Sequence, residues 1–138
     1  MSLPHLRDAA PARPESAIVK EILQYLNRQP GVVAWRQNRG SLIAEYKGKW
    51  RRVNFGVPGM SDIGGFIRYE IPEQRRHVAV YFAFEVKRPG WKPKGKRERF
   101  RWEEQLAFLS RVRMSGGPAA MVTSVDDVIA VLARWRAR

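Results

Sequence analysis

HVAVYFAFEVK (residues 77–87) is the most hydrophobic stretch of this 138-residue chain. Its β-branched and aromatic residues predict a strand in the middle of a sheet, with both faces covered. Successive side chains alternate along a strand, so Glu85 and Lys87 point to one face while Val86 points to the other. Two charges at the end of such a strand are either a solvated strand end or parts of a shared polar site.

The segments around this strand predict one α/β domain. Helix-period apolar residues, β-rich runs and breaks at glycine and proline give the order α-β-hairpin-β-β-α-β-α. The expected helices cover 14–28, 97–114 and 124–135, and the expected strands cover 32–37, 42–46, 49–55, 60–69, 77–87 and 119–123. Strand pairing by both hairpin and crossover predicts a mixed central β-sheet flanked by helices. Residues 1–13 are expected to form a flexible N-terminal arm and residues 14–138 the single domain, with Trp35 and Trp50 in its core.

The charge of the chain predicts a polyanionic partner. Lys and Arg outnumber Asp and Glu by 26 to 13, which gives a net charge of +13. Such an excess favours binding to nucleic acid, although a basic surface kept for solubility is the alternative. Cysteine is absent, no apolar run is long enough to span a bilayer, and the first residues hold no apolar core of a secretory signal. We therefore expect a cytoplasmic protein.

Much of the positive charge is clustered in KRPGWKPKGKRERFR (residues 87–101). Proline and glycine keep its first part from being helix or strand, so a mobile loop is expected there. Such a loop suits the tracking of a DNA backbone. Trp91 either stacks on a base or packs down onto the protein. The DNA-binding candidates in this cluster are Arg88, Trp91, Lys92, Lys94, Lys96 and Arg97.

Asp62 is the candidate partner of the two charges that end the hydrophobic strand. It follows a Gly-Pro-Gly break at the start of strand 60–69, and an antiparallel return through residues 70–76 brings that start beside Glu85. Two carboxylates held together repel unless a cation or a proton joins them. Oxygen ligands of this kind suit Mg²⁺ or Mn²⁺, and Lys87 adds a point charge beside the metal. A metal ion held by two carboxylates, with a lysine beside it, is the smallest set of groups needed to hydrolyse a phosphodiester bond.

The motifs GVPGMSD (56–62), EVK (85–87) and a downstream helix carrying Gln105 resemble the PD-(D/E)XK nuclease superfamily. They are most similar to its VRR-NUC branch, in the stand-alone form found in phages and bacteria. The resemblance runs from about Glu15 to the end of the chain and implies a restriction-endonuclease-like core of order α-β-β-β-α-β. Ser61 stands where the superfamily name has proline, at a position that varies.

The resemblance also implies roles for single residues. Asp62, Glu85 and the Val86 carbonyl would bind the metal, Glu15 of the first helix would complete its site, and Lys87 would be the catalytic lysine. Gln105 would position the site or contact DNA. Arg36 and Asn38, in WRQNRG, match a further motif of the branch and are DNA-binding candidates. Glu15 and Gln105 also have simpler interpretations, as a first-turn acid and a helix-edge amide.

The expected activity is that of a Mg²⁺- or Mn²⁺-dependent DNA endonuclease. Stand-alone members of the branch resemble Holliday-junction resolvases, which implies a homodimer that makes paired nicks in branched DNA, leaving 5′-phosphate and 3′-hydroxyl ends. Two alternatives stay open on the residues alone. One is a nuclease for flaps, nicks or duplex DNA, and the other is a non-catalytic DNA-binding module with the same fold.

Overall fold

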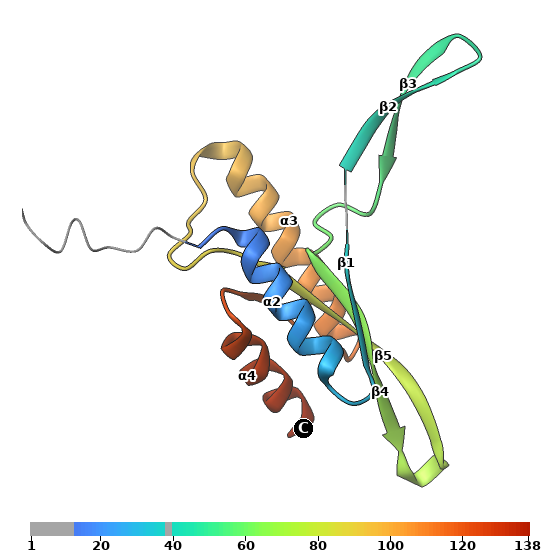
Figure 1. Cartoon of the computed structure of the whole chain (residues 1–138), viewed down its shortest axis with the longest axis vertical. Helices are drawn as coiled ribbons and strands as arrows, with labels where there is room; N and C mark the ends of the chain where they lie inside the picture. Colours follow the sequence, from blue (N-terminus) through green and yellow to red (C-terminus); the bar gives the residue numbers. More distant parts are fainter. Residues whose placement is uncertain (1–12, 38–39) are drawn as a thin grey trace, which may run out of the picture.

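Four strands form the main sheet of the computed structural model, which describes residues 13–37 and 40–138. Their order is β1-β4-β5-β6, and Figure 1 shows β1, β4 and β5 side by side. The pairs β1–β4 and β4–β5 are antiparallel, whereas β5 and β6 are parallel. The predicted mixed sheet is therefore confirmed. The strands are β1 (Val32–Arg36), β4 (Ile63–Ile71), β5 (Arg76–Val86) and β6 (Ala119–Val122).

Helices cover both faces of this sheet, as the sequence predicts. The helices are α2 (Glu15–Arg28), α3 (Gly95–Met114) and α4 (Val125–Arg136) in the described part of the chain. Apolar side chains of α2 and α4 pack with Phe82, Phe84 and Val86 on one face, and α3 packs against Ala83 and Ala119 on the other. Since side chains alternate along β5, Glu85 lies on the α3 face together with Ala83. The helix that carries Gln105 therefore covers the face that carries the strand's acid.

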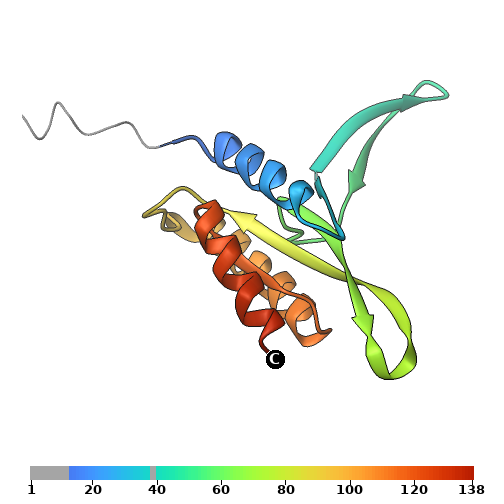
Figure 2. The ribbon, with the colours of Figure 1, turned by 60° about the horizontal axis from the view of Figure 1, so that its bottom comes forward.

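A second, two-stranded sheet is the hairpin of β2 (Gly40–Tyr46) and β3 (Lys49–Phe55). Lys47 and Gly48 join the strands and both have positive φ, at 51° and 75°, as a type I′ turn requires. The hairpin was predicted at this turn and is confirmed. Figures 1 and 2 show it projecting away from the main sheet and from the helices.

The expectation that Trp35 and Trp50 belong to the core is wrong. Trp50 is 68% exposed because the hairpin that carries it lies outside the packed domain. Trp35 is also exposed; its strand turns Val32 and Ala34 toward the core, so the alternating Trp35 faces away from it. Its ring meets the edge of Phe66 on the neighbouring strand.

Two boundaries beside the candidate site differ from the sequence-based expectation, by three residues at the start of β4 and by two at the start of α3. Strand β4 begins at Ile63, so Asp62 lies in the turn just before the strand. Helix α3 begins at Gly95, because the Glu98 carboxylate accepts a hydrogen bond from the Lys94 N–H at 2.6 Å and caps the helix start. Lys96 and Arg97 therefore lie in the first turn of α3, and the loop proper covers 87–94.

The N-terminal arm, residues 1–13 in the expectation, lies outside the described residues except for Arg13. The Arg13 guanidinium pairs with Glu21 on the exposed side of α2. None of the helices within 13–37 and 40–138 has the length and apolar character needed to cross a membrane.

Candidate active site

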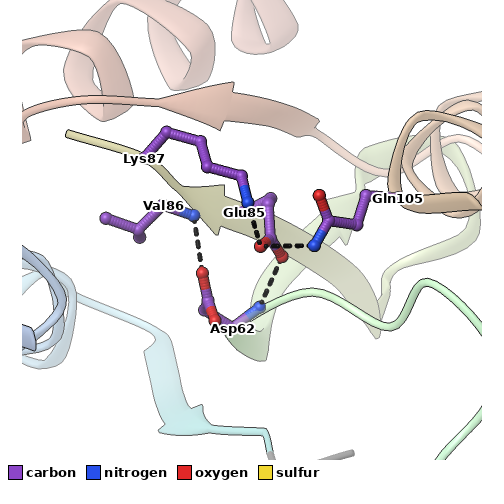
Figure 3. A network of polar contacts seen from close by, with 5 residues as sticks. All are labelled: Asp62, Glu85, Val86, Lys87 and Gln105. Carbon is purple, nitrogen blue, oxygen red and sulfur yellow. Dashed lines mark hydrogen bonds and ion pairs between the residues drawn. The ribbon is translucent and has the colours of Figure 1, made fainter. Parts of the chain in front are cut away.

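Asp62 and Glu85 meet where β4 begins and β5 ends. In the antiparallel register Ile63 is opposite Phe84, so one residue beyond this pair Asp62 is opposite Glu85. Each carboxylate accepts a hydrogen bond from the other segment's backbone: the Val86 N–H donates to Asp62 Oδ2 at 2.8 Å, and the Asp62 N–H donates to Glu85 Oε2 at 3.1 Å (Figure 3). The predicted convergence of the two acids is confirmed as geometry.

Lys87 joins this pair from the next position on the same face of β5. Its Nζ lies 3.6 Å from Glu85 Oε1, and its side chain is largely buried. The ring of Trp91 covers the ammonium group, with Nζ 4.3 Å from the ring centroid. Trp91 is half-buried in this position. In this structure, then, the loop tryptophan packs on the lysine, which is the second of the two interpretations left open by the sequence.

Glu85 is one of two buried polar or charged residues among those described, with 4% of its surface exposed. Its pKa is raised from 4.5 to about 8, mainly by burial and then by the negative charge of Asp62, while Lys87 opposes the rise. Removing water from a carboxylate disfavours its charged form, and a second acid nearby adds repulsion. The pair therefore has a strong tendency to take up a proton or a cation.

Gln105 holds Glu85 from the opposite side. It extends from α3, and its Nε2 donates to Glu85 Oε1 at 3.0 Å (Figure 3). The other amide atom, Oε1, is buried and accepts no hydrogen bond from any described residue. A buried carbonyl oxygen without a donor is uncommon and calls for an explanation, such as an ion that the site can bind. Gln105 is thus placed at the acid pair, in agreement with the sequence-based expectation.

The loop that carries Asp62 is fixed by its contact with α3. Gly59 has φ of +74°, and a Cβ at this position would lie 2.1 Å from the Glu104 carbonyl oxygen. Only glycine fits such a close approach with this backbone conformation. The GVPG motif therefore lets the loop reach the helix beside Gln105, which sets the distance between Asp62 and the site's other residues.

Gln37 is a supporting residue that the sequence did not single out, although it lies inside WRQNRG. Its side chain donates to Ser61 Oγ at 3.1 Å and accepts from the Tyr81 hydroxyl at 2.8 Å. Its backbone N–H donates to the Asp62 carbonyl at 2.7 Å. Ser61 is buried, and its hydroxyl donates to the Ile63 carbonyl at 2.8 Å. Ser61 thus has a structural role of its own in the turn before β4.

A polar hollow of about 250 Å³ opens beside the acid pair. Arg36, at the end of β1, and Arg101, on α3, contribute to its wall together with Gln37, Asp62, Glu85 and Gln105. Arg36 was a DNA-binding candidate, and Arg101 belongs to the basic cluster. The acids therefore share their hollow with two guanidinium groups, which are suited to the oxygens of a bound phosphate.

A second hollow, of about 640 Å³, lies under the basic loop. Lys87, Arg88, Trp91 and Lys92 line it from the loop, and Arg99 and Trp102 line it from α3. Lys87 thus connects the two hollows, since it contacts Glu85 on one side and Trp91 on the other. The remaining candidates of the cluster, Lys94, Lys96 and Arg97, are exposed at the end of the loop and the start of α3.

One of the predicted metal ligands, Glu15, is not brought to the acid pair. Glu15 lies in the first turn of α2, the helix on the opposite face from α3, and no three His, Cys, Asp or Glu residues gather as a metal group anywhere in the described residues. Val86 contributes its N–H to Asp62, and the ligand role expected for its carbonyl stays a prediction. Asn38 lies outside the described residues.

Comparisons with protein-family models, with curated proteins and with solved structures found no match for this chain. The family resemblance therefore remains a proposal that rests on the residues described above.

Proposed function

We propose that this chain is a Mg²⁺- or Mn²⁺-dependent endodeoxyribonuclease of the PD-(D/E)XK superfamily and of its VRR-NUC branch. The observation that supports this best is the cluster of Asp62, the buried Glu85 and Lys87, which lies beside two hollows lined by basic side chains. A non-catalytic DNA-binding module would gain nothing from two acids at this place, because they repel phosphate.

The donor set fits a hard divalent cation. Asp62 and Glu85 would hold it, while Gln105, whose Nε2 donates to Glu85 Oε1, fixes the orientation of one of the two acids. Mg²⁺ is commonly held by one or two carboxylates, with water and substrate phosphate as its other ligands, so two acids are sufficient. When bound, the ion would supply Lewis acidity to the phosphate and a lowered pKa to a water molecule.

The protein's own residues position and stabilise the reacting phosphate. Lys87 places a cation 3.6 Å from Glu85, where the negative charge of an attacked phosphodiester would accumulate. Trp91 covers the ammonium group and excludes water from that side. Gln105 fixes the Glu85 carboxylate through its hydrogen bond, and Arg36 and Arg101 would bind non-bridging phosphate oxygens.

Branched DNA is the substrate we propose, cut by paired nicking in a homodimer. The choice of four-way junctions as substrate follows from the family resemblance. The net charge of +13 supports the binding of DNA. A symmetric junction presents two equivalent phosphates, so a twofold dimer would match it with two identical sites.

Cleavage of labelled four-way junction, flap and duplex DNA tests the proposal. We expect cutting with Mg²⁺ or Mn²⁺ and none with EDTA, and we expect Asp62→Asn to abolish it. Asp126→Asn, which removes the same charge from the exposed first turn of α4, is the matched control and is expected to cut normally.

Each other outcome removes a defined part of the proposal. No cutting of any substrate with either metal contradicts the enzyme, and DNA binding without cutting leaves the non-catalytic module. Equal cutting of junction, flap and duplex removes the preference for branched DNA. A monomer in light scattering, both free and on junction DNA, contradicts paired nicking.

A further inference from the structure

The β2–β3 hairpin has no part in the site described above, yet it is a large and exposed element. Neither of its strands pairs with the main sheet. Tyr46 and Trp50 are 66% and 68% exposed, and Ile43 is exposed as well. A two-stranded hairpin that no helix or third strand covers is only marginally stable in water. Aromatic side chains displayed on such an element are explained more simply by a binding partner.

One face of the hairpin combines aromatic and basic groups. Residues opposite one another in an antiparallel pair share a face, and here Tyr46 is opposite Lys49 while Ala44 is opposite Arg51. Lys47 at the turn joins this face, because its Nζ lies 5.4 Å from the centroid of the Tyr46 ring. The face thus displays three cations and an aromatic ring without an acid.

The charge of the hairpin favours a polyanion over a second copy of the chain. Residues 40–55 contain four basic residues, Lys47, Lys49, Arg51 and Arg52, and one acid, Glu45. Two such hairpins would repel each other, whereas a phosphate backbone would attract both strands. Cations that neutralise phosphates also release the counterions condensed on DNA, which favours binding.

The position of the hairpin relates it to the proposed cleavage site. In Figures 1 and 2 the hairpin and the basic loop after β5 extend in opposite directions from the place where β4 begins and β5 ends. Asp62 and Glu85 lie at that place. Strands of seven residues span about 24 Å, a length of about seven base pairs, and a two-stranded ribbon fits the major groove of B-DNA.

We propose that the β2–β3 hairpin is a second DNA-binding element, which lies along the duplex on one side of the cleaved phosphate while the basic loop holds the other side. This inference rests on the proposed nuclease function and adds the surface that would bind the flanking duplex. Its basic face, with Lys47, Lys49 and Arg51, contacts the phosphates.

The salt dependence of DNA binding tests this role. Fluorescence anisotropy of a labelled duplex in EDTA, over a series of KCl concentrations, gives the Kd and the slope of log K against log salt. We compare the full chain with a hairpin triple variant, Lys47→Ala/Lys49→Ala/Arg51→Ala. A control triple, Arg134→Ala/Arg136→Ala/Arg138→Ala, removes the same charge from the last turn of α4 and the residues after it, and α4 lies on the opposite face of the sheet from α3.

We expect the hairpin triple to make the slope of log K against log salt less steep, by about 0.9 for each phosphate that the hairpin no longer neutralises. We also expect it to weaken DNA binding at least tenfold at physiological salt. The control is expected to change the slope by less than the amount for a single phosphate. Because the hairpin lies outside the packed core, both triples should melt at the temperature of the unmodified chain. Equal effects of the two triples would show that only net charge matters, and would overturn the proposal.

Three further outcomes distinguish failure of this inference from failure of the proposed function. A steep slope that the hairpin triple leaves unchanged contradicts the hairpin's role while the nuclease stands. No binding of duplex by the unmodified chain contradicts the hairpin's role, and the cleavage of four-way junctions then decides the nuclease separately. If Tyr46→Ala/Trp50→Ala converts a dimer to a monomer in light scattering and leaves the salt slope unchanged, the hairpin binds a second copy, and the DNA-binding role is wrong.

Discussion

Replacing Glu85 by glutamine should stabilise the protein at alkaline pH and abolish cleavage at the same time. The substitution keeps the size of the side chain and removes its negative charge. Glu85 is only 4% exposed and lies next to Asp62. A buried carboxylate next to another acid costs free energy that the neutral amide does not. Stability and activity therefore change in opposite directions at this residue.

The size of the effect follows from the pKa of Glu85, which lies at about 8 in the folded chain against an ordinary value of 4.5. Because the folded pKa is the higher one, the unfolded chain loses its proton first as the pH rises. The associated stability is complete below pH 4.5 and is lost as the pH rises through 8. At 1.36 kcal/mol for each pH unit, the loss has an upper limit of about 5 kcal/mol, a large part of the stability of a small domain.

Chemical denaturation in EDTA at pH 5 and pH 8 measures this difference. We expect the free energy of unfolding of the unmodified chain to fall between the two values and that of Glu85→Gln to fall much less. Mg²⁺ at pH 8 should restore stability to the unmodified chain only. Glu103→Gln, on the exposed side of α3, is the matched control. A stability difference between Glu85→Gln and the unmodified chain that is the same at both pH values would refute the reasoning.

Two further substitutions test the positions of Lys87 and Gly59. Lys87→Met should lower the single-turnover cleavage rate about 100-fold or more, because it removes the charge that stabilises the attacked phosphate. The Kd for DNA should change little. A Kd that rises as much as the rate falls would show that the lysine acts in binding instead. Gly59→Ala should cost about 2–4 kcal/mol in thermal or chemical unfolding, because the added Cβ meets the Glu104 carbonyl at positive φ. Gly48→Ala, with a similar φ and nothing within 4 Å, should cost only about 1 kcal/mol, and equal costs would show that the contact with α3 is unimportant.

Local rules were sufficient to predict the centre of the candidate site. The alternation of side chains along β5 places Glu85 and Lys87 on one face, and a short connection returns the chain antiparallel, which brings Asp62 to Glu85. Both rules depend on residues near each other in sequence or on one strand pair. The element order and the mixed sheet followed from the same kind of reasoning.

The features that the sequence did not reveal depend on packing between distant segments. Gln37 acquires its role only when β1 lies beside the start of β4, so that its amide reaches Ser61 and Tyr81. The expectation that Trp50 lies in the core is wrong because its side chain is exposed on a hairpin whose two strands pair only with each other. For Glu15 to lie beside the two acids, α2 must have a particular position relative to β4 and β5. The periodicity of apolar residues along a helix does not define that position.

The reciprocal hydrogen bonds between Asp62 and the end of β5 tie the candidate chemistry to the pairing of β4 with β5. Two acids that lie 23 positions apart in the sequence share a ring of hydrogen bonds that exists only once β4 and β5 have paired. A nascent or partly unfolded chain has the same residues but no site. The proposed nuclease would therefore cut DNA only after β4 and β5 have paired, so a chain in which these strands are apart would leave DNA intact.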